Sequence, residues 1–240
     1  MKQNLRTKSI KSILVLTLII FSFSFFTACN EDQNPITPPP ETTALSITHA
    51  SPDAPNLDIS VANISRAQNF SYLRTLPYID LVPGLNRIVI STTNISTVLI
   101  DTTVFLQQDL FYSIFAIDSF ANIRPLVLTD DLGLPGSTNS NIRFINLTPN
   151  LNLQPVDIQA QGKAIPWFPF YAFPQAAAYR PVTAGTYTID MNLAGSSTTI
   201  FTLADVALIQ GNIYTLISTG FDGASGPQAL GLTLIQNYPF

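Results

Sequence analysis

The stretch Gly185-Thr-Tyr-Thr-Ile-Asp-Met191 alternates polar and apolar residues directly after a glycine. Successive side chains of a β-strand point to opposite faces, so this alternation predicts a strand with one buried and one solvated face. Other short segments rich in Ile, Val, Thr and Phe recur along the chain with turn residues between them. They cover 44–50, 57–62, 86–91, 102–107, 111–118 and 122–129. No helical periodicity interrupts them, so the sequence predicts an all-β chain.

The chain beyond residue 43 divides into two halves that resemble each other. Leu57-Asp58-Ile59 is matched by Val156-Asp157-Ile158, and Tyr78 with Pro83-Gly84 is matched by Tyr179 with Ala184-Gly185. Between the halves, segment 132–141 is rich in Gly, Pro, Ser and Asn, which favour turns. We therefore predict two tandem immunoglobulin-like β-sandwich domains of about seven strands each, over 44–131 and 142–240, with 132–141 as the joint.

The first 28 residues have the composition of a secretory signal peptide. Lys2, Arg6, Lys8 and Lys11 precede an uncharged apolar run over 13–26. This run is shorter than the roughly 18 residues expected of a spanning helix. It leads into Phe26-Thr27-Ala28-Cys29, which resembles the lipobox of bacterial lipoproteins. The resemblance implies that Cys29 is acylated after cleavage. The alternative is an ordinary signal peptide or membrane anchor with an incidental cysteine.

Segment 29–43 is rich in proline and poor in apolar residues, so it cannot contribute to a core. We predict that it is a lipid-anchored linker, with the acyl chains on Cys29 as its contact with the membrane. Glu31 and Asp32 are similar to the acidic export signals of some surface lipoproteins. We therefore expect a bacterial protein held at the outer membrane or cell surface.

Composition excludes several classes of partner and site. The chain has 11 basic and 15 acidic residues, with four of the basic ones in the first eleven positions. Binding to nucleic acid needs a basic surface, so we expect no nucleic-acid partner. A single cysteine and a single histidine exclude a disulfide framework, a Cys-rich zinc site and every motif that needs two histidines. We expect no cofactor and no metal site.

The stretch His49-Ala-Ser-Pro-Asp-Ala-Pro-Asn-Leu-Asp-Ile59 resembles the opening of the family of domain of unknown function 4397 (DUF4397). Segments 179–188 and 210–215 are also similar to that family. In the second half, the corresponding opening over 144–150 has Asn146 in place of the histidine and Asn150 in place of the aspartate. The resemblance implies two tandem copies of a secreted or lipid-anchored β-sandwich module, and it implies no established catalytic reaction.

Two groups of residues are candidates for binding. His49 and Asp53, with Asp58 nearby, have the chemistry of a metal or acid–base site, but Ser-Pro-Asp is also turn chemistry in which these side chains bond to nearby backbone. The aromatic segment 165–174 would stack on a sugar or a peptide if exposed, or would cover a core if buried. Its candidate residues are Trp167, Phe168, Phe170 and Tyr171.

We predict a non-enzymatic binding, adhesion or spacer module of the cell envelope, whose partner is a glycan, a peptide or an envelope protein. The alternative is an extracellular, glycosidase-like hydrolase that works through carboxylates. A serine hydrolase with a G-x-S-x-G elbow is not expected, because the sequence has no such motif.

Overall fold

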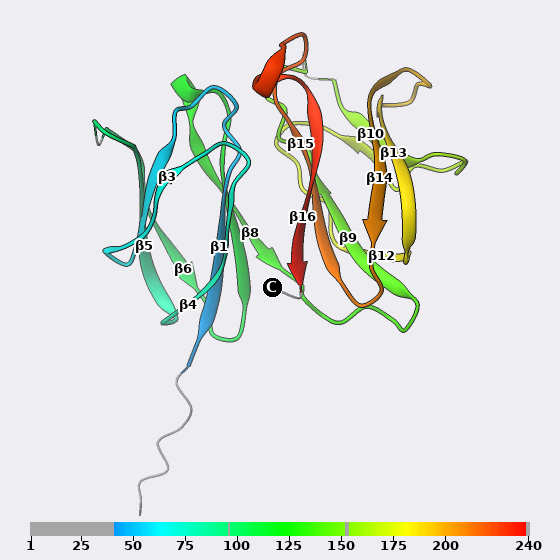
Figure 1. Cartoon of the computed structure of the whole chain (residues 1–240). Helices are drawn as coiled ribbons and strands as arrows, with labels where there is room; N and C mark the ends of the chain where they lie inside the picture. Colours follow the sequence, from blue (N-terminus) through cyan, green and yellow to red (C-terminus); the bar gives the residue numbers. More distant parts are fainter. Residues whose placement is uncertain (1–40, 96, 152–153, 239–240) are drawn as a thin grey trace, which may run out of the picture. The chain divides into compact units, whose positions relative to one another are not determined.

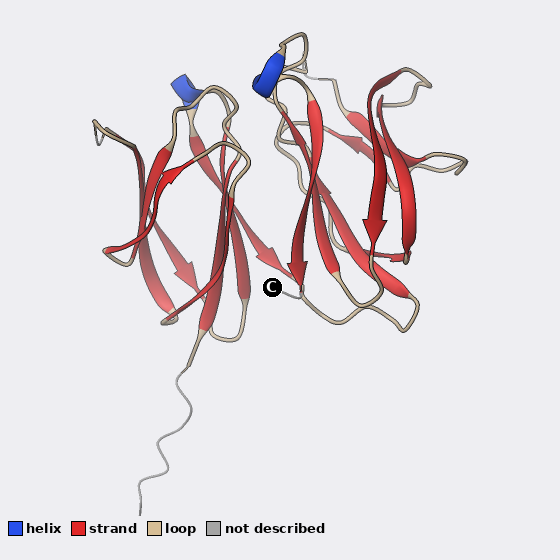
Figure 2. Cartoon of the chain, viewed as in Figure 1, coloured by secondary structure: helices blue, strands red, loops and turns tan. Residues whose placement is uncertain are grey.

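A computed structural model describes residues 41–95, 97–151 and 154–238 (Figure 1). Strands make up nearly all of the regular structure, with two three-residue 3-10 turns, η1 (Phe120–Asn122) and η2 (Gly226–Gln228), between them (Figure 2). The all-β prediction is therefore confirmed. The predicted signal peptide, Cys29 and most of the linker lie outside the described residues. Among those described, no helix has the length and hydropathy needed to cross a bilayer.

The strands form two groups of eight. The first group is β1 (Thr43–His49), β2 (Leu57–Val61), β3 (Ile64–Phe70), β4 (Thr75–Leu81), β5 (Gly84–Thr92), β6 (Val98–Leu106), β7 (Phe111–Ile117) and β8 (Arg124–Asp130). The second group is β9 (Asn139–Ile145), β10 (Val156–Ala160), β11 (Phe168–Tyr171), β12 (Arg180–Thr183), β13 (Gly185–Leu193), β14 (Thr199–Leu208), β15 (Ile213–Thr219) and β16 (Gly231–Tyr238).

Both groups have the same sheet topology. In the first, one sheet has the order β4-β1-β7-β8 and the other β3-β2-β5-β6. The second repeats these orders strand for strand as β12-β9-β15-β16 and β11-β10-β13-β14. Each group is thus a sandwich of two four-stranded sheets, as predicted, although each has eight strands rather than about seven.

Alternating side chains build the two cores. Along β5, Asn86, Ile88 and Ile90 are buried, whereas Leu85 and Arg87 are exposed. The inward residues of the first sandwich include Leu45, Ile47, Leu57, Ile59, Ile88, Ile90 and Ile114. Those of the second include Phe144, Val156, Ile158, Ile189, Met191 and Leu216.

Two strands depart from this alternation, because all seven residues of β1 and of β15 are buried. One face of each strand covers its own core. A third apolar cluster combines residues of both sandwiches, with Phe115 and Ile117 from β7, Ile145 from β9 and Ile217 from β15. Residues Glu41–Phe240 accordingly form one compact unit. Strand β9 begins at Asn139, within the segment 132–141 that we assigned to the joint. That the two halves are separable domains stays a prediction.

The first strand of each sandwich lies inside a sheet. β1 pairs in parallel with β7, from Ala44 opposite Phe111 to His49 opposite Ala116, and antiparallel with β4. β9 pairs in the same parallel manner with β15. The loop that follows β1 or β9 therefore starts beside the end of the seventh strand of its sandwich.

The sequence did not predict β3 and β4. β3 reads Ile-Ser-Arg-Ala-Gln-Asn-Phe, and only Phe70 of its seven residues is fully buried. β4 contains Pro77, which a sheet tolerates at an edge because proline lacks an N–H. Both are edge strands of their sheets, so neither needs the apolar alternation that marks an interior strand.

Candidate functional site

His49 ends β1 and is buried, with 1% of its surface exposed. Its Nε2 lies 3.2 Å from the carbonyl oxygen of Pro55, and the backbone N–H of Ser51 donates to its Nδ1 at 3.4 Å. A carbonyl only accepts, so Nε2 carries the proton of a neutral ring. Burial lowers the pKa of His49 to about 4, and the imidazole is neutral at pH 7.

Asn146 directly follows β9 and, like His49, accepts one backbone hydrogen bond and donates another. Its Oδ1 accepts from the backbone N–H of Thr148, two residues later, at 3.1 Å, and its Nδ2 donates to the carbonyl of Tyr171 at 2.9 Å. A neutral imidazole and an amide can each accept one bond and donate another. Both side chains therefore accept from the backbone N–H two residues later, a bond that requires no proton transfer, whereas the donated bond goes to the same loop in His49 and to β11 in Asn146.

Asp58 and Asp157 also share a task. Asp58 Oδ1 accepts from the backbone N–H of Asn69 at 2.9 Å, and Asp157 Oδ1 accepts from that of Phe170 at 2.7 Å. Asn69 and Phe170 have positive φ angles of 51° and 61°, a backbone conformation that disfavours residues with a Cβ. Each carboxylate therefore holds the next strand in a strained local conformation.

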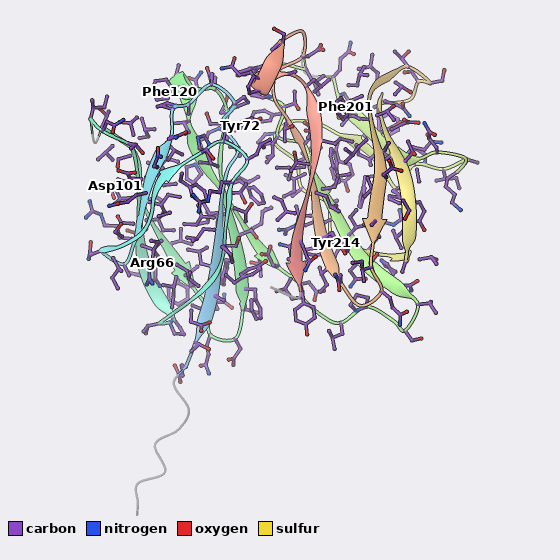
Figure 3. The ribbon with its side chains drawn as sticks, viewed as in Figure 1. Arg66, Tyr72, Asp101, Phe120, Phe201 and Tyr214 are labelled. Carbon is purple, nitrogen blue, oxygen red and sulfur yellow. The ribbon has the colours of Figure 1, made fainter. Side chains whose placement is uncertain are left out.

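Asp53 is exposed, and its Oδ1 accepts from the backbone N–H of Phe120 at 2.7 Å, which ties the loop after β1 to the turn after β7 (Figure 3). Asn150 accepts in the same manner from the N–H of Asp222 at 2.8 Å. His49, Asp53 and Asp58 thus each accept a hydrogen bond from a backbone N–H. Within the described ranges, no three His, Cys, Asp or Glu side chains come together in a way that could hold a metal ion.

The aromatic segment divides between core and surface. Trp167 and Phe168 are 8% and 3% exposed, and the Trp167 ring meets that of Tyr187 edge-on at 5.0 Å between centroids. Tyr171 is half-buried against the second core, whereas Phe170 is 63% exposed. The pairing of β11 with β10 has a register shift and Phe170 has a positive φ angle, so Phe168 and Tyr171 both contact the core while Phe170 points outward. Of the four aromatic candidates, Trp167 and Phe168 are therefore withdrawn from any ligand at the surface, while Phe170 is accessible.

A buried ion pair connects the last strand of the first sandwich to the first strand of the second. Nη1 of Arg143 lies 2.7 Å from Oδ1 of Asp130, and the two side chains are 3% and 0% exposed. Arg143 also donates through Nε to Thr215 Oγ1 at 2.9 Å, and its guanidinium lies 4.6 Å from the ring centroid of Tyr179. Ser113 donates to the other carboxylate oxygen of Asp130. These contacts offset part of the desolvation of the two charges, although Nη2 of Arg143 has no hydrogen-bond partner among the described residues.

Tyr78 extends this network to β16. Its hydroxyl donates to Asp130 and accepts from Nδ2 of Asn237 at 3.1 Å. Burial and, after it, the negative charge of Asp130 raise the pKa of Tyr78 far above its usual range, so the hydroxyl keeps its proton. Burial likewise raises the pKa of Tyr179. Tyr78 and Tyr179 are matched residues of the sequence repeat.

A groove of about 410 Å³ lies between β4 and β16, with Tyr78 and Asn237 in its wall. Its volume falls in the range of small-ligand sites. Hydroxyl and amide groups lie there among apolar side chains, and none of the described lining residues carries a formal charge. The lining residues are Ser46, Leu73, Thr75, Pro77, Tyr78, Thr233, Leu234, Ile235, Gln236 and Asn237.

Neither the ion pair nor the groove was predicted from the sequence. The repeat matched Tyr78 with Tyr179, which was the one available signal. It could not show that the two tyrosines take part in one buried network, because the repeat compares the halves and does not show where they touch. Asp130 and Arg143 flank the predicted joint, where charged residues are normally solvated.

Residues 43–154 match the family described as "Domain of unknown function (DUF4397)". This segment belongs to the DUF4397 family. The DUF4397 match covers β1 to β9 and ends in the loop after β9, so it includes both His49 and Asn146.

Beyond the DUF4397 segment, comparisons give little more. No curated protein matches the sequence. A solved structure with similarity to the chain is CBMbc (family CBM26) from Eubacterium rectale Amy13K in complex with maltoheptaose. The two are 9% identical, with 82% of this chain and 98% of that chain covered and a TM-score of 0.25. A TM-score this low transfers no property of that structure to this chain.

Proposed function

We propose that the protein is a non-enzymatic binding module, anchored by lipid on Cys29 at the outer membrane or cell surface of a bacterium. Its ligand is an uncharged one, a neutral glycan or a peptide segment, and it occupies the groove between β4 and β16. The anchor is supported by the basic N-terminus, the apolar run over 13–26 and the lipobox-like sequence that ends at Cys29.

The uncharged side chains of the described groove lining are the observation that supports binding over catalysis. A carboxylate-dependent hydrolase needs two acidic side chains on either side of the scissile bond, and the ten lining residues include none. The single histidine is buried in a loop and neutral. Hydroxyl and amide groups such as those of Thr75, Thr233 and Gln236 are suited to the hydroxyls of a sugar or the amides of a peptide.

Hydrogen bonds on either side of the groove favour a rigid site. Tyr78 of the first sandwich is bonded to Asn237 of the second, and the hydroxyl of Tyr72 accepts from the backbone N–H of Gly220 at 2.9 Å (Figure 3). The walls come from different sandwiches and are held together before any ligand arrives. A preformed groove loses less conformational entropy when it binds.

The test uses the full chain, a panel of neutral glycans and peptides, and two variants. Thr233→Arg places a long side chain into the groove and should weaken binding at least about tenfold, equivalent to roughly 1.4 kcal/mol. Thr186→Arg, on exposed β13 surface, is the matched control and should leave binding unchanged. Equal ligand affinities of the two variants would show that the ligand binds outside the groove. Turnover of a glycan that paired Asp→Asn replacements abolish would favour the hydrolase.

We further propose that the second sandwich is another copy of the same module. Support comes from the identical strand orders and from the matched bonds of His49 and Asn146 and of Asp58 and Asp157. A family comparison restricted to residues 142–240 and including the asparagine variants of the opening motif would test this assignment.

A further inference from the structure

Three large apolar side chains are exposed together at one end of the first sandwich. Val82, Leu85 and Phe105 have 77%, 75% and 61% of their surface exposed. Leu85 of β5 and Phe105 of β6 are directly opposite each other in the strand pair, so their side chains are neighbours on one face. Val82 lies in the turn that leads into β5, where its carbonyl accepts from Asn86 Nδ2 at 3.0 Å. We call these three residues the tether-side patch.

The patch lies where the N-terminal segment joins the sandwich. Thr43, the first residue of β1, pairs with Leu81, the residue before Val82. Figure 1 shows the start of β1 at the same end of the sandwich as the end of β4. All of residues 1–40, with the apolar run over 13–26 and Cys29, therefore connect to the sandwich beside this patch.

The second sandwich shows that the fold itself does not require apolar residues here. The turn Val82-Pro83-Gly84 corresponds to Thr183-Ala184-Gly185. In the same register, the pair Leu85–Phe105 corresponds to Thr186–Ala207. Thr183, Thr186 and Ala207 are exposed as well. The same backbone positions thus hold small or polar residues in the second sandwich and large apolar ones in the first, beside the N-terminal segment.

We propose that the tether-side patch rests on the surface of the lipid bilayer to which the chain is anchored. This inference depends on the proposed lipid anchor at Cys29. The anchor confines the patch near the bilayer at a high effective concentration, so partial insertion of three side chains suffices for contact. A patch of this kind elsewhere on the sandwich would not gain from the tether.

Charges around the patch select the headgroup. Asp80 and Asp109 are exposed at the same end, and Arg87 is neutralised by Asp101 at 2.6 Å. The carboxylates oppose an anionic surface. The patch therefore fits a bilayer of neutral headgroups, such as phosphatidylcholine or phosphatidylethanolamine, better than one rich in phosphatidylglycerol.

The experiment uses the lipidated full chain in phosphatidylcholine vesicles that contain brominated lipid, a contact quencher of tryptophan. Phe105→Trp puts a probe in the patch, and Val98→Trp puts one at the opposite end of β6, where Val98 is 55% exposed. The buried Trp167 gives the same background in both. The Phe105→Trp probe should lose about half of its emission and the Val98→Trp probe little of it. Adding Val82→Thr and Leu85→Thr, the residues of the second sandwich, should restore the emission, and phosphatidylglycerol should weaken the quenching.

Flotation of the vesicles separates the two proposals. If the protein floats but both probes are quenched equally, the lipid anchor is supported and the contact between the patch and the bilayer is refuted. Protein that does not float refutes the anchor, and the bilayer contact fails with it. A blue shift of the Phe105→Trp probe that depends on protein concentration, without quenching by brominated lipid, would show that a second copy of the chain covers the patch.

Discussion

Replacing His49 by asparagine should remove the acid sensitivity of the fold while preserving its loop. Asn146 already accepts from the backbone N–H two residues later, so the amide oxygen of His49→Asn can accept from the N–H of Ser51 in the same way, and its NH2 group can donate in place of Nε2. The variant should therefore fold with nearly the same free energy of unfolding at pH 7. His49→Ala, which has neither donor nor acceptor, is the control and should be less stable at every pH.

The magnitude follows from the two pKa values of His49. The ordinary pKa of histidine is 6.5, and burial lowers that of His49 in the folded protein to about 4. Between these values the unfolded chain binds a proton that the folded chain does not, so stability falls as the pH falls. At 1.36 kcal/mol per pH unit, lowering the pH from 7 to 5 should cost about 2 kcal/mol. His49 is the only histidine, and the carboxylates titrate mainly below this window.

Urea denaturation at pH 7, 6 and 5, followed by circular dichroism, measures this effect. The unsubstituted protein should lose stability on acidification, and His49→Asn should lose much less. An equal loss in both proteins would assign the acid sensitivity to other groups. A flat profile for the unsubstituted protein would show that the buried imidazole accepts a proton without cost, and the description of its loop would be wrong.

Asp130→Asn should lower the free energy of unfolding by about 3 to 5 kcal/mol, because Arg143 then keeps a buried charge without a counter-ion. The double variant Asp130→Leu with Arg143→Met, which replaces both charges by apolar side chains, should lower it less. A decrease below about 1 kcal/mol for Asp130→Asn in urea denaturation would contradict a desolvated ion pair. Trp167→Ala should lower the free energy of unfolding by about 3 to 5 kcal/mol. In the unsubstituted, unliganded protein, the emission of Trp167 should be blue-shifted and resist quenching by acrylamide. Easily quenched emission would place the ring at the surface. Limited proteolysis should cut first within 131–138 or before the first strand, and resistance there with one cooperative unfolding step would refute separable domains. Cys29→Ser should abolish lipid labelling and release the protein from the membrane fraction, and unchanged labelling refutes the anchor.

The interior strands could be predicted from the sequence because their alternation is local. β2, β5 and β13 show it directly, and the expected segments 57–62, 86–91 and 185–191 overlap them. The edge strands β3 and β4 were missed because an edge needs fewer apolar residues. The complete burial of β15 was not predictable, because its second face contributes Ile217 to a cluster that also contains residues of the first sandwich.

The candidate site was harder to predict for a related reason. The opening motif of the family drew attention to His49 and Asp53, whose hydrogen bonds lie within or near their own loops. The groove residues Thr75 and Gln236 are far apart in the sequence and belong to no motif. They meet only because β4 and β16 are edge strands that approach each other in the folded chain. No pattern within either half contains that information.

The parallel pairing of β1 with β7 determines how the protein resists mechanical load. Any pull on the chain before Glu41 enters the fold along the axis of β1. Since β1 lies between β4 and β7, the pull acts along both ladders and shears their hydrogen bonds together instead of opening them one at a time. Forced unfolding is governed by the rate of crossing such a barrier. A strand in the interior of a sheet is therefore a stronger point of attachment than an edge strand, which could be peeled away from a single neighbour.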